Sequence, residues 1–241
     1  MQRTTVHRPQ GVGSLRQLAC LASLGALLSG CPSFLLMQGP DTLDPGRYEL
    51  SAGMGWTYRG TAMAVPGTGI VVPSTGDTQL DLMARRGLAE GLDGGLRFQT
   101  ADWGLAADLR WRFLDTPNFQ AAVAPRAAIS LMALAGSLIP NVETLAYHLE
   151  VPILMGFGPK GKSRWLGSVR LLYASWGGSV TIDPNTGAGT GAEFFMPGLT
   201  VGKELPVLWG WLRATTEGTL FIDLDTGTPM VQVGVALAIG K

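Results

Sequence analysis

Few side chains in this sequence are suited to acid–base or nucleophilic catalysis. The chain has 241 residues and two histidines, and only His148 lies beyond residue 30. A Ser-His-acid site would therefore depend on His148. On a β-strand, where successive side chains alternate between two faces, His148 and Glu150 would share one face and could pair. We expect that the protein is not an enzyme, and a hydrolase that uses His148 is the alternative.

The sequence also lacks a complete set of metal ligands. A single histidine beyond residue 30 is too few for the usual zinc sites. The stretch DPNTGAGTGAEF begins like a calcium loop, with Asp183, Asn185 and Gly187. Its twelfth position is Phe194, however, where a calcium loop requires Glu. We expect a surface loop there and no metal or other cofactor.

The chemistry that the sequence favours is lipid attachment at Cys31. Residues 1–30 contain three arginines, no acid and the apolar run LACLASLGALL, which is too short for a membrane-spanning helix. The run ends in Leu-Ser-Gly-Cys31, which resembles the bacterial lipobox. The resemblance implies that 1–30 is a lipoprotein signal peptide and that Cys31 becomes the lipid-modified N-terminus. An ordinary signal peptide, or a short membrane helix with a chance cysteine, is the alternative.

The composition limits the remaining possibilities. Cys20, the only other cysteine, lies in the apolar run, so the mature chain has no disulfide. The formal net charge is zero and no basic cluster occurs, which argues against nucleic acid as a partner. Residues 31–46 contain three prolines and are predicted to be a tether. Its apolar patch at 34–37 would lie against lipid headgroups, or the tether would fold onto the following domain, 47–241.

From residue 47 onward, apolar and polar residues alternate with a period of two. In YELSAGMGWTY, the residues Tyr48, Leu50, Met54 and Trp56 share one face, which is typical of a β-strand. No amphipathic helix is predicted after residue 30. The ten stretches with this alternation are, roughly, 47–59, 78–88, 92–99, 103–114, 119–131, 142–157, 164–176, 192–204, 208–222 and 230–240.

The connections between these stretches are alternately long and short, apart from a short one at 100–102. The long ones are 60–77, 132–141, 177–191 and 223–229. The short ones are 89–91, 115–118, 159–163 and 205–207. This asymmetry is typical of outer-membrane barrels, which have short periplasmic turns and longer outer loops. An even number of strands then returns both ends of the barrel to the periplasm.

Three features favour an apolar face that points outward into lipid. The stretches are long enough to cross the apolar band of a membrane. The polar faces contain few lysines, and the four in the chain, Lys160, Lys162, Lys203 and Lys241, fall at predicted periplasmic ends. Aromatic residues gather near the strand ends, as in interfacial girdles. They are Trp56, Tyr58, Trp103, Trp111, Phe113, Trp165, Tyr173 and Trp209.

If the apolar faces point outward, the polar faces define a lumen with nearly balanced charge. Its predicted acids are Glu49, Asp81, Asp93, Asp108, Glu150 and Glu217. Its predicted bases are Arg85, Arg97, Arg110, Arg112, Arg126, Arg170 and Arg213. Because a barrel of about ten strands is narrow and unpaired buried charges are costly, we expect a lumen largely filled by Arg–carboxylate pairs.

Residues 47–240 resemble small bacterial outer-membrane β-barrel proteins, on this pattern and on stretches such as GLDGGLRF and GLAADLRWRFL. The resemblance implies an all-β fold: a closed antiparallel up-and-down β-barrel of about ten strands, of the transmembrane type. Pro125, Pro152 and Pro197 lie inside predicted strands, where each removes a ladder hydrogen bond, so we expect local bulges there.

The expected protein is thus an outer-membrane barrel with its lipid on the periplasmic side. Its role would be structural or partner-binding, and its partners would be membrane lipid and other envelope proteins. An alternative is a soluble periplasmic barrel, tethered by Cys31, that carries a lipid-like ligand inside. A hydrolase that uses His148 at the barrel rim is a further alternative.

Overall fold

We analysed a computed structural model of the chain. It describes residues 35–36, 38–59, 63–64, 71–72, 76–100, 103–131, 142–181, 187–207 and 211–240. The predicted signal peptide and Cys31 lie outside these residues, as do Trp209, Lys241 and Asp183. Within the described part of the chain, no helix is both long enough and apolar enough to cross a membrane.

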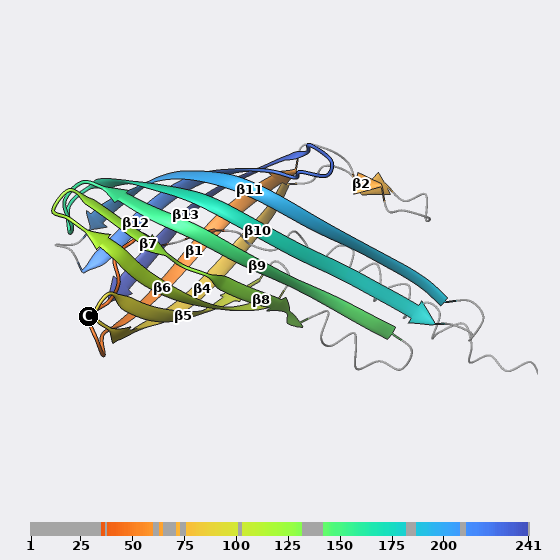
Figure 1. Cartoon of the computed structure of the whole chain (residues 1–241), viewed down its shortest axis with the longest axis horizontal. Helices are drawn as coiled ribbons and strands as arrows, with labels where there is room; N and C mark the ends of the chain where they lie inside the picture. Colours follow the sequence, from red (N-terminus) through yellow and green to blue (C-terminus); the bar gives the residue numbers. More distant parts are fainter. Residues whose placement is uncertain are drawn as a thin grey trace, which may run out of the picture.

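The described strands form a closed antiparallel β-barrel (Figure 1). They are β1 (Tyr48–Arg59), β4 (Gly76–Ala89), β5 (Leu92–Gln99), β6 (Gly104–Asp115), β7 (Phe119–Val123), β8 (Arg126–Ser130), β9 (Val142–Phe157), β10 (Arg164–Thr181), β11 (Gly187–Val207), β12 (Leu212–Ile222) and β13 (Pro229–Gly240). Each strand pairs with its neighbours in sequence, and β1 pairs with both β4 and β13, which closes the ring. The two-residue strands β2 (Met63–Ala64) and β3 (Val71–Val72) pair with each other outside this sheet.

Strands β7 and β8 are two halves of one barrel strand. Both pair with β6 on one side and with β9 on the other, in a register that continues across the break. Counting β7 and β8 as one strand gives ten strands, which confirms the fold class and strand count predicted from the sequence.

The prolines interrupt hydrogen bonds without producing the expected bulges. Pro125 separates β7 from β8, but its carbonyl still accepts a hydrogen bond from the Leu109 amide at 3.1 Å. Pro152 lies within β9, opposite Arg170, and accepts from the Ala124 amide at 3.0 Å. Pro197 immediately precedes Gly198, which is the first residue of β11 that pairs with β12. The register shifts instead occur at Gly87–Ala89 and Arg112–Leu114, next to short turns. The bulge prediction was therefore wrong.

The polarity of the barrel is the reverse of a soluble domain. Along β1, the outward side chains Leu50, Met54 and Trp56 are 60%, 54% and 42% exposed, whereas the inward Glu49 and Thr57 are buried. Across the sheet, the buried polar residues include six arginines, several carboxylates and most of the glutamines. The predicted outward apolar face is confirmed, and this arrangement contradicts a soluble barrel that holds a lipid in an apolar interior.

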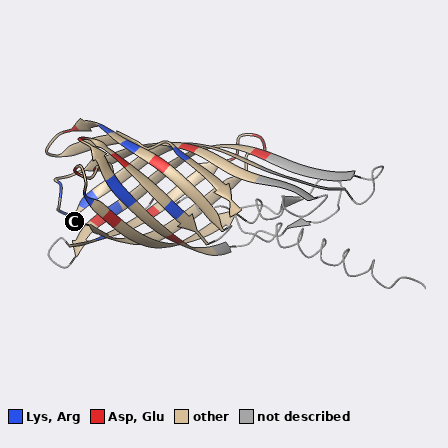
Figure 2. Cartoon of the chain, turned by 90° about the horizontal axis from the view of Figure 1, so that it is seen from below, with Lys and Arg blue, Asp and Glu red and all other residues tan. Residues whose placement is uncertain are grey.

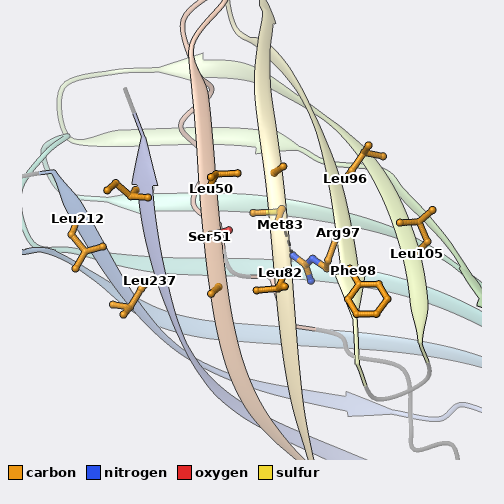
Figure 3. A pocket seen from close by; sticks show the side chains of 13 residues that line it. Leu50, Ser51, Leu82, Met83, Leu96, Arg97, Phe98, Leu105, Leu212 and Leu237 are labelled. Carbon is orange, nitrogen blue, oxygen red and sulfur yellow. Dashed lines mark hydrogen bonds between the residues drawn. The ribbon is translucent and has the colours of Figure 1, made fainter.

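A shallow hollow of about 600 Å³ on the outer wall has the same apolar character (Figure 3). It lies over β12, β13, β1, β4, β5 and β6, where Ala52 and Ala84 are flanked by larger side chains such as Leu50 and Leu96. Its polar lining residues, Ser51 and Arg97, are buried and belong to the inward face. The hollow is thus a part of the apolar surface where small residues leave space.

Aromatic side chains form belts at the two ends of the apolar surface. Trp56 stacks on Tyr58 at one end, where Phe98 also meets Trp103 edge to face. At the short-turn end the aromatic pairs are Trp111 with Phe113 and Phe119 with Phe157, and Lys203 lies over the Trp165 ring. The described members of the predicted belt are exposed, except for the half-buried Tyr173.

Strands β9, β10 and β11 extend beyond the rest of the barrel at the end opposite the short turns (Figure 1). They contain 16, 18 and 21 residues. A tilted strand of 18 residues rises roughly 40 Å, well beyond the apolar band of about 25 Å. The barrel therefore has a short-turn rim and a projecting sheet at its long-loop end.

Candidate functional site: the filled lumen

Charged residues lie on neighbouring strands of the barrel wall (Figure 2), and most of their side chains on the inward face are buried in the lumen. On β4–β6, Arg85 donates hydrogen bonds to both Asp93 and Asp108, and Arg110 bonds Asp93 at 2.5 Å. All four side chains are nearly fully buried. Gly95 is required beside them, because a Cβ there would lie 2.7 Å from an Arg85 guanidinium nitrogen. This group pairs two buried guanidinium groups with two carboxylates.

A second buried group lies on β8–β10. The Glu150 carboxylate accepts a hydrogen bond from Arg170 and lies 3.5 Å from Arg126. Arg170 also lies over the Phe221 ring, 4.7 Å from its centroid. Phe221 belongs to an apolar layer with Leu172, Met196 and Met230, so this side of the lumen changes from charged to apolar toward the long-loop end.

The N-terminal segment enters this lumen. Arg97 donates to the carbonyls of Leu35 and Leu36, the latter at 2.6 Å, and the Leu36 amide donates to Glu217 at 2.7 Å. Farther along the segment, Arg110 donates to the Gly39 carbonyl at 2.8 Å. We call residues 35–43 the lumen segment. The described residues of the predicted tether from Leu35 onward therefore enter the barrel, and Leu35 and Leu36 are buried there and do not contact headgroups.

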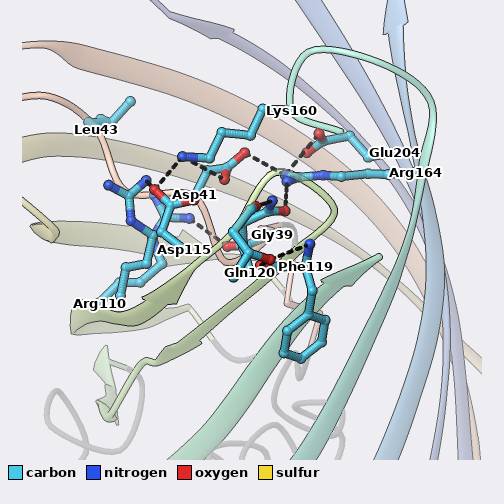
Figure 4. A network of polar contacts seen from close by, with 12 residues as sticks. Gly39, Asp41, Leu43, Arg110, Asp115, Phe119, Gln120, Lys160, Arg164 and Glu204 are labelled. Carbon is cyan, nitrogen blue, oxygen red and sulfur yellow. Dashed lines mark hydrogen bonds and ion pairs between the residues drawn. The ribbon is translucent and has the colours of Figure 1, made fainter. Parts of the chain in front are cut away.

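Near the short-turn rim, the lumen segment joins a network of ion pairs (Figure 4). Asp41 lies 2.7 Å from Arg164, which also pairs with Glu204 at 3.0 Å and bonds Gln120 at 3.1 Å. The Leu43 amide donates to Asp93 at 2.9 Å, which links this network to the charged group on β4–β6. The segment is therefore held at its start, its middle and its end.

Glycines of the barrel wall provide the space that the lumen segment occupies. A Cβ at Gly55 or Gly234 would lie 2.8 or 2.3 Å from a methyl carbon of Leu35. A Cβ at Gly156 would lie 2.9 Å from Pro40. Leu36 packs in a buried cluster with Ala122, Ala124 and Leu154. The glycines and alanines of the wall thus lie where the lumen segment packs against it.

Most of the charged lumen was predicted from the alternation. All the predicted acids and bases are buried, except that Glu217, Arg112 and Arg213 are half-buried. Each of these three still has a charged or main-chain partner: Leu36 for Glu217, Asp115 for Arg112 at 3.1 Å, and Glu49 for Arg213.

The sequence analysis did not include Arg164 and Glu204 among the lumen charges, and it gave folding of the tether onto the barrel domain only as an alternative, without placing it in the lumen. Arg164 and Glu204 pair with each other at the short-turn end of β10 and β11. Both lie inside the expected stretches 164–176 and 192–204, so the alternation was sufficient to place them on the lumen face. The only signal for the segment was the run of small inward residues on β1, Ser51, Gly53 and Gly55, which leaves room for another chain.

The candidate catalytic residues are not arranged as a rim site. His148 is 3% exposed and lies within the lumen on the same face as Glu150, whose carboxylate is engaged by Arg170. Asp223 accepts hydrogen bonds from the Thr226 hydroxyl at 2.5 Å and from the Asp225 amide at 3.2 Å, so it shapes its own turn. The described residues contain no group of three or more side chains placed to hold a metal ion.

Comparisons with known proteins give structural matches only. No protein-family model matches the sequence, and no curated protein does. An outer membrane channel from Pseudomonas putida F1 has 11% identity and a TM-score of 0.43, covering 83% of this chain and 97% of the channel. The outer membrane protease OmpT from Escherichia coli has 9% identity and a TM-score of 0.41, covering 84% and 98%. Ail of Yersinia pestis has 8% identity and a TM-score of 0.36, covering 82% and 99%. Similarities at this level say nothing about activity or location.

Proposed function

We propose that this protein is a lipid-anchored outer-membrane β-barrel with a structural or partner-binding role and no enzymatic activity. The observation that carries the proposal is the polarity of the barrel, with leucine, valine and aromatic side chains outside and charged side chains inside. Such a surface is stable in hydrocarbon and unstable in water, because the exposed apolar area would be left in contact with solvent.

The filled lumen supports a role other than open transport. Arg97, Arg164 and Arg170 are nearly fully buried, and the lumen segment is bonded to Arg97 and Arg164. An aqueous channel requires a wider barrel or an unoccupied interior. The intact chain is therefore expected to be closed to bulk solutes.

The projecting sheet of β9–β11 is the surface on which we expect a partner. The ladder between β11 and β12 ends at Gly198, and the Leu224 amide still donates to the Phe195 carbonyl at 3.1 Å. Among the described strands, residues 187–194 of β11 pair only with β10, so this part extends past the barrel wall. A sheet that projects from the membrane presents side chains and main chain to molecules on that side. An envelope protein is the expected partner class.

The position of Leu35 bears on the side of the membrane that a lipid on Cys31 would reach. Leu35 contacts Gly55 of β1, which pairs with Gln79 of β4. Asp44 contacts Gly87, which lies on β4 eight residues beyond Gln79, at the short-turn rim. Leu35 is thus roughly 18 Å in height from the short-turn rim. The four residues from Cys31 to Leu35 span at most about 14 Å. This length is too short for Cys31 to reach the short-turn rim. The geometry favours a lipid at the long-loop end over the periplasmic side expected from the sequence.

The test is the fractionation of a Cys31→Ala variant. A membrane barrel is expected to remain in the detergent-extracted outer-membrane fraction, and its unboiled form is expected to migrate differently from the boiled form on an SDS gel. The wild-type protein is the control for both measurements. Release of Cys31→Ala into the soluble periplasmic fraction would contradict the proposal.

A further inference from the structure

We propose that the lumen is a binding site for an extended peptide, that residues 35–43 are its resident ligand, and that withdrawal of this segment opens an anion-preferring pore. The inference assumes the membrane barrel proposed above and adds a ligand class and a gate to it.

The polar contacts identify the ligand as a peptide main chain. Arg97 and Arg110 donate to the carbonyls of Leu35, Leu36 and Gly39. Two further contacts, from the Leu36 and Leu43 amides to carboxylates of the wall, also use main-chain atoms. Because these groups occur in every peptide, the contacts recognise an extended chain more than a side-chain sequence.

Two features add selectivity to this site. One is Asp41, whose carboxylate lies 2.7 Å from the buried Arg164 and 4.0 Å from Lys160. The other is the pair Leu35 and Leu36, which are 1% and 3% exposed and fit against Gly55 and Ala122. The preferred ligand is thus an extended peptide with two adjacent leucines and an aspartate five residues later.

The lumen segment is attached in a way that permits withdrawal. It belongs to none of the described strands, and its hydrogen bonds and ion pairs with the wall are made to side chains. Its only covalent connection to the barrel wall is through residues 44–47, and its other end leads to Cys31, whose proposed lipid lies in the membrane outside the lumen. Withdrawal would therefore leave the barrel's ladder hydrogen bonds in place.

The charges left behind set the expected selectivity. Without the segment, Arg97 loses two carbonyl acceptors and keeps Asp81 at 3.8 Å. Arg164 loses Asp41 and keeps Glu204 and Gln120. The lumen thus loses one negative charge and several oxygen acceptors while every arginine remains, so anions are favoured over cations.

The experiment compares two proteins purified from membranes in planar lipid bilayers. One is the intact mature chain and the other lacks residues 35–43. The intact chain is expected to be closed, and the deletion variant is expected to give discrete conductance steps with a reversal potential that indicates anion preference in a KCl gradient. A synthetic peptide of residues 34–46, FLLMQGPDTLDPG, is expected to close the deletion variant, and the same peptide with Asp41→Lys is expected to act more weakly.

A second variant keeps the chain intact, in case the deletion prevents folding. Gly55→Leu would place side-chain atoms where Leu35 lies, and eviction of the segment is expected to open the pore. Gly218→Leu is the matched control, because no heavy atom lies within 4 Å of a Cβ at Gly218. The difference between boiled and unboiled gel migration reports folding separately from conductance.

The outcomes separate the two proposals. A folded deletion variant and a folded Gly55→Leu variant that both stay closed would overturn the gate, as would an intact chain that conducts as well as they do. Failure of the peptide to close the deletion variant would overturn the peptide site. A chain that never enters the membrane fraction would instead refute the membrane barrel itself.

Discussion

At the scale of single residues, Arg97 connects the barrel wall to the lumen segment. Arg97 is 1% exposed. Its guanidinium donates hydrogen bonds to the carbonyls of Leu35 and Leu36 and lies 3.8 Å from the Asp81 carboxylate. Arg97→Ala would leave two carbonyls and a carboxylate without this donor in a buried setting. We expect a loss of about 3–5 kcal/mol in the free energy of unfolding, measured by denaturant unfolding in lipid vesicles.

The neighbouring arginine Arg86 is the control for this change. Arg86 is exposed near the short-turn rim and lies 5.2 Å from the centroid of the Tyr48 ring. Arg86→Ala is therefore expected to leave the unfolding midpoint nearly unchanged. Equal effects of the two substitutions would mean that Arg97 does not hold the segment.

The pair Glu150 and Arg170 tests whether the lumen charges stabilise the barrel or only compensate one another. Replacement of one partner, as in Glu150→Gln or Arg170→Met, leaves a buried charge behind and is expected to cost about 3–5 kcal/mol. Glu150→Gln alone leaves two buried arginines, Arg126 and Arg170, without this carboxylate, whereas the double variant leaves only Arg126, so the double variant is expected to be more stable than Glu150→Gln. The measurement is a double-mutant cycle of unfolding free energies, and strictly additive losses would contradict pairing.

At the scale of the strands, the projecting part of the sheet is expected to be dispensable for folding. The outermost residues of β10 and β11 pair with each other and lie beyond the end of the β11–β12 ladder. Replacement of residues 179–189 by Asn-Gly would join Gly178 to Thr190, which are already paired, through a tight turn. We expect an unchanged gel shift and unfolding midpoint but the loss of co-purifying envelope proteins. A barrel that fails to assemble would show that the extension is needed for folding.

The strands were predictable because each has one lipid-facing and one lumen-facing side. A period of two appears whenever the two faces differ in polarity, and in β1 and β6 it identifies the direction of nearly every side chain. The alternation could not predict that the strand register continues across Pro125 and Pro152 without a bulge. A barrel strand tolerates a missing hydrogen bond when its neighbours fix the register on both sides, and no local sequence signal reports that.

The lumen segment was not predictable for a different reason. Residues 35–43 have no periodicity of their own, and their conformation depends on arginines and glycines that are distant in sequence, such as Arg97 and Gly234. Prolines and glycines typical of a loose linker are equally compatible with an irregular chain that fills a cavity. Only the three-dimensional closure of the barrel brings these groups together.

At the scale of the whole molecule, the lumen segment determines where the N-terminus emerges. Ser33 precedes Leu35 by two residues, so Ser33→Cys is expected to react with a membrane-impermeant maleimide on intact cells if the chain leaves at the long-loop end. Asp225→Cys, in the exposed turn after β12, is the positive control, and Asn118→Cys, in a short turn, is expected to react only after permeabilisation. The reason is chain length: Leu35 lies roughly 18 Å in height from the short-turn rim, and four residues from Cys31 cover at most about 14 Å. Labelling of Ser33→Cys that requires permeabilisation, as for Asn118→Cys, would place the lipid on the periplasmic side and would require the lumen segment to lie outside the barrel in the cell.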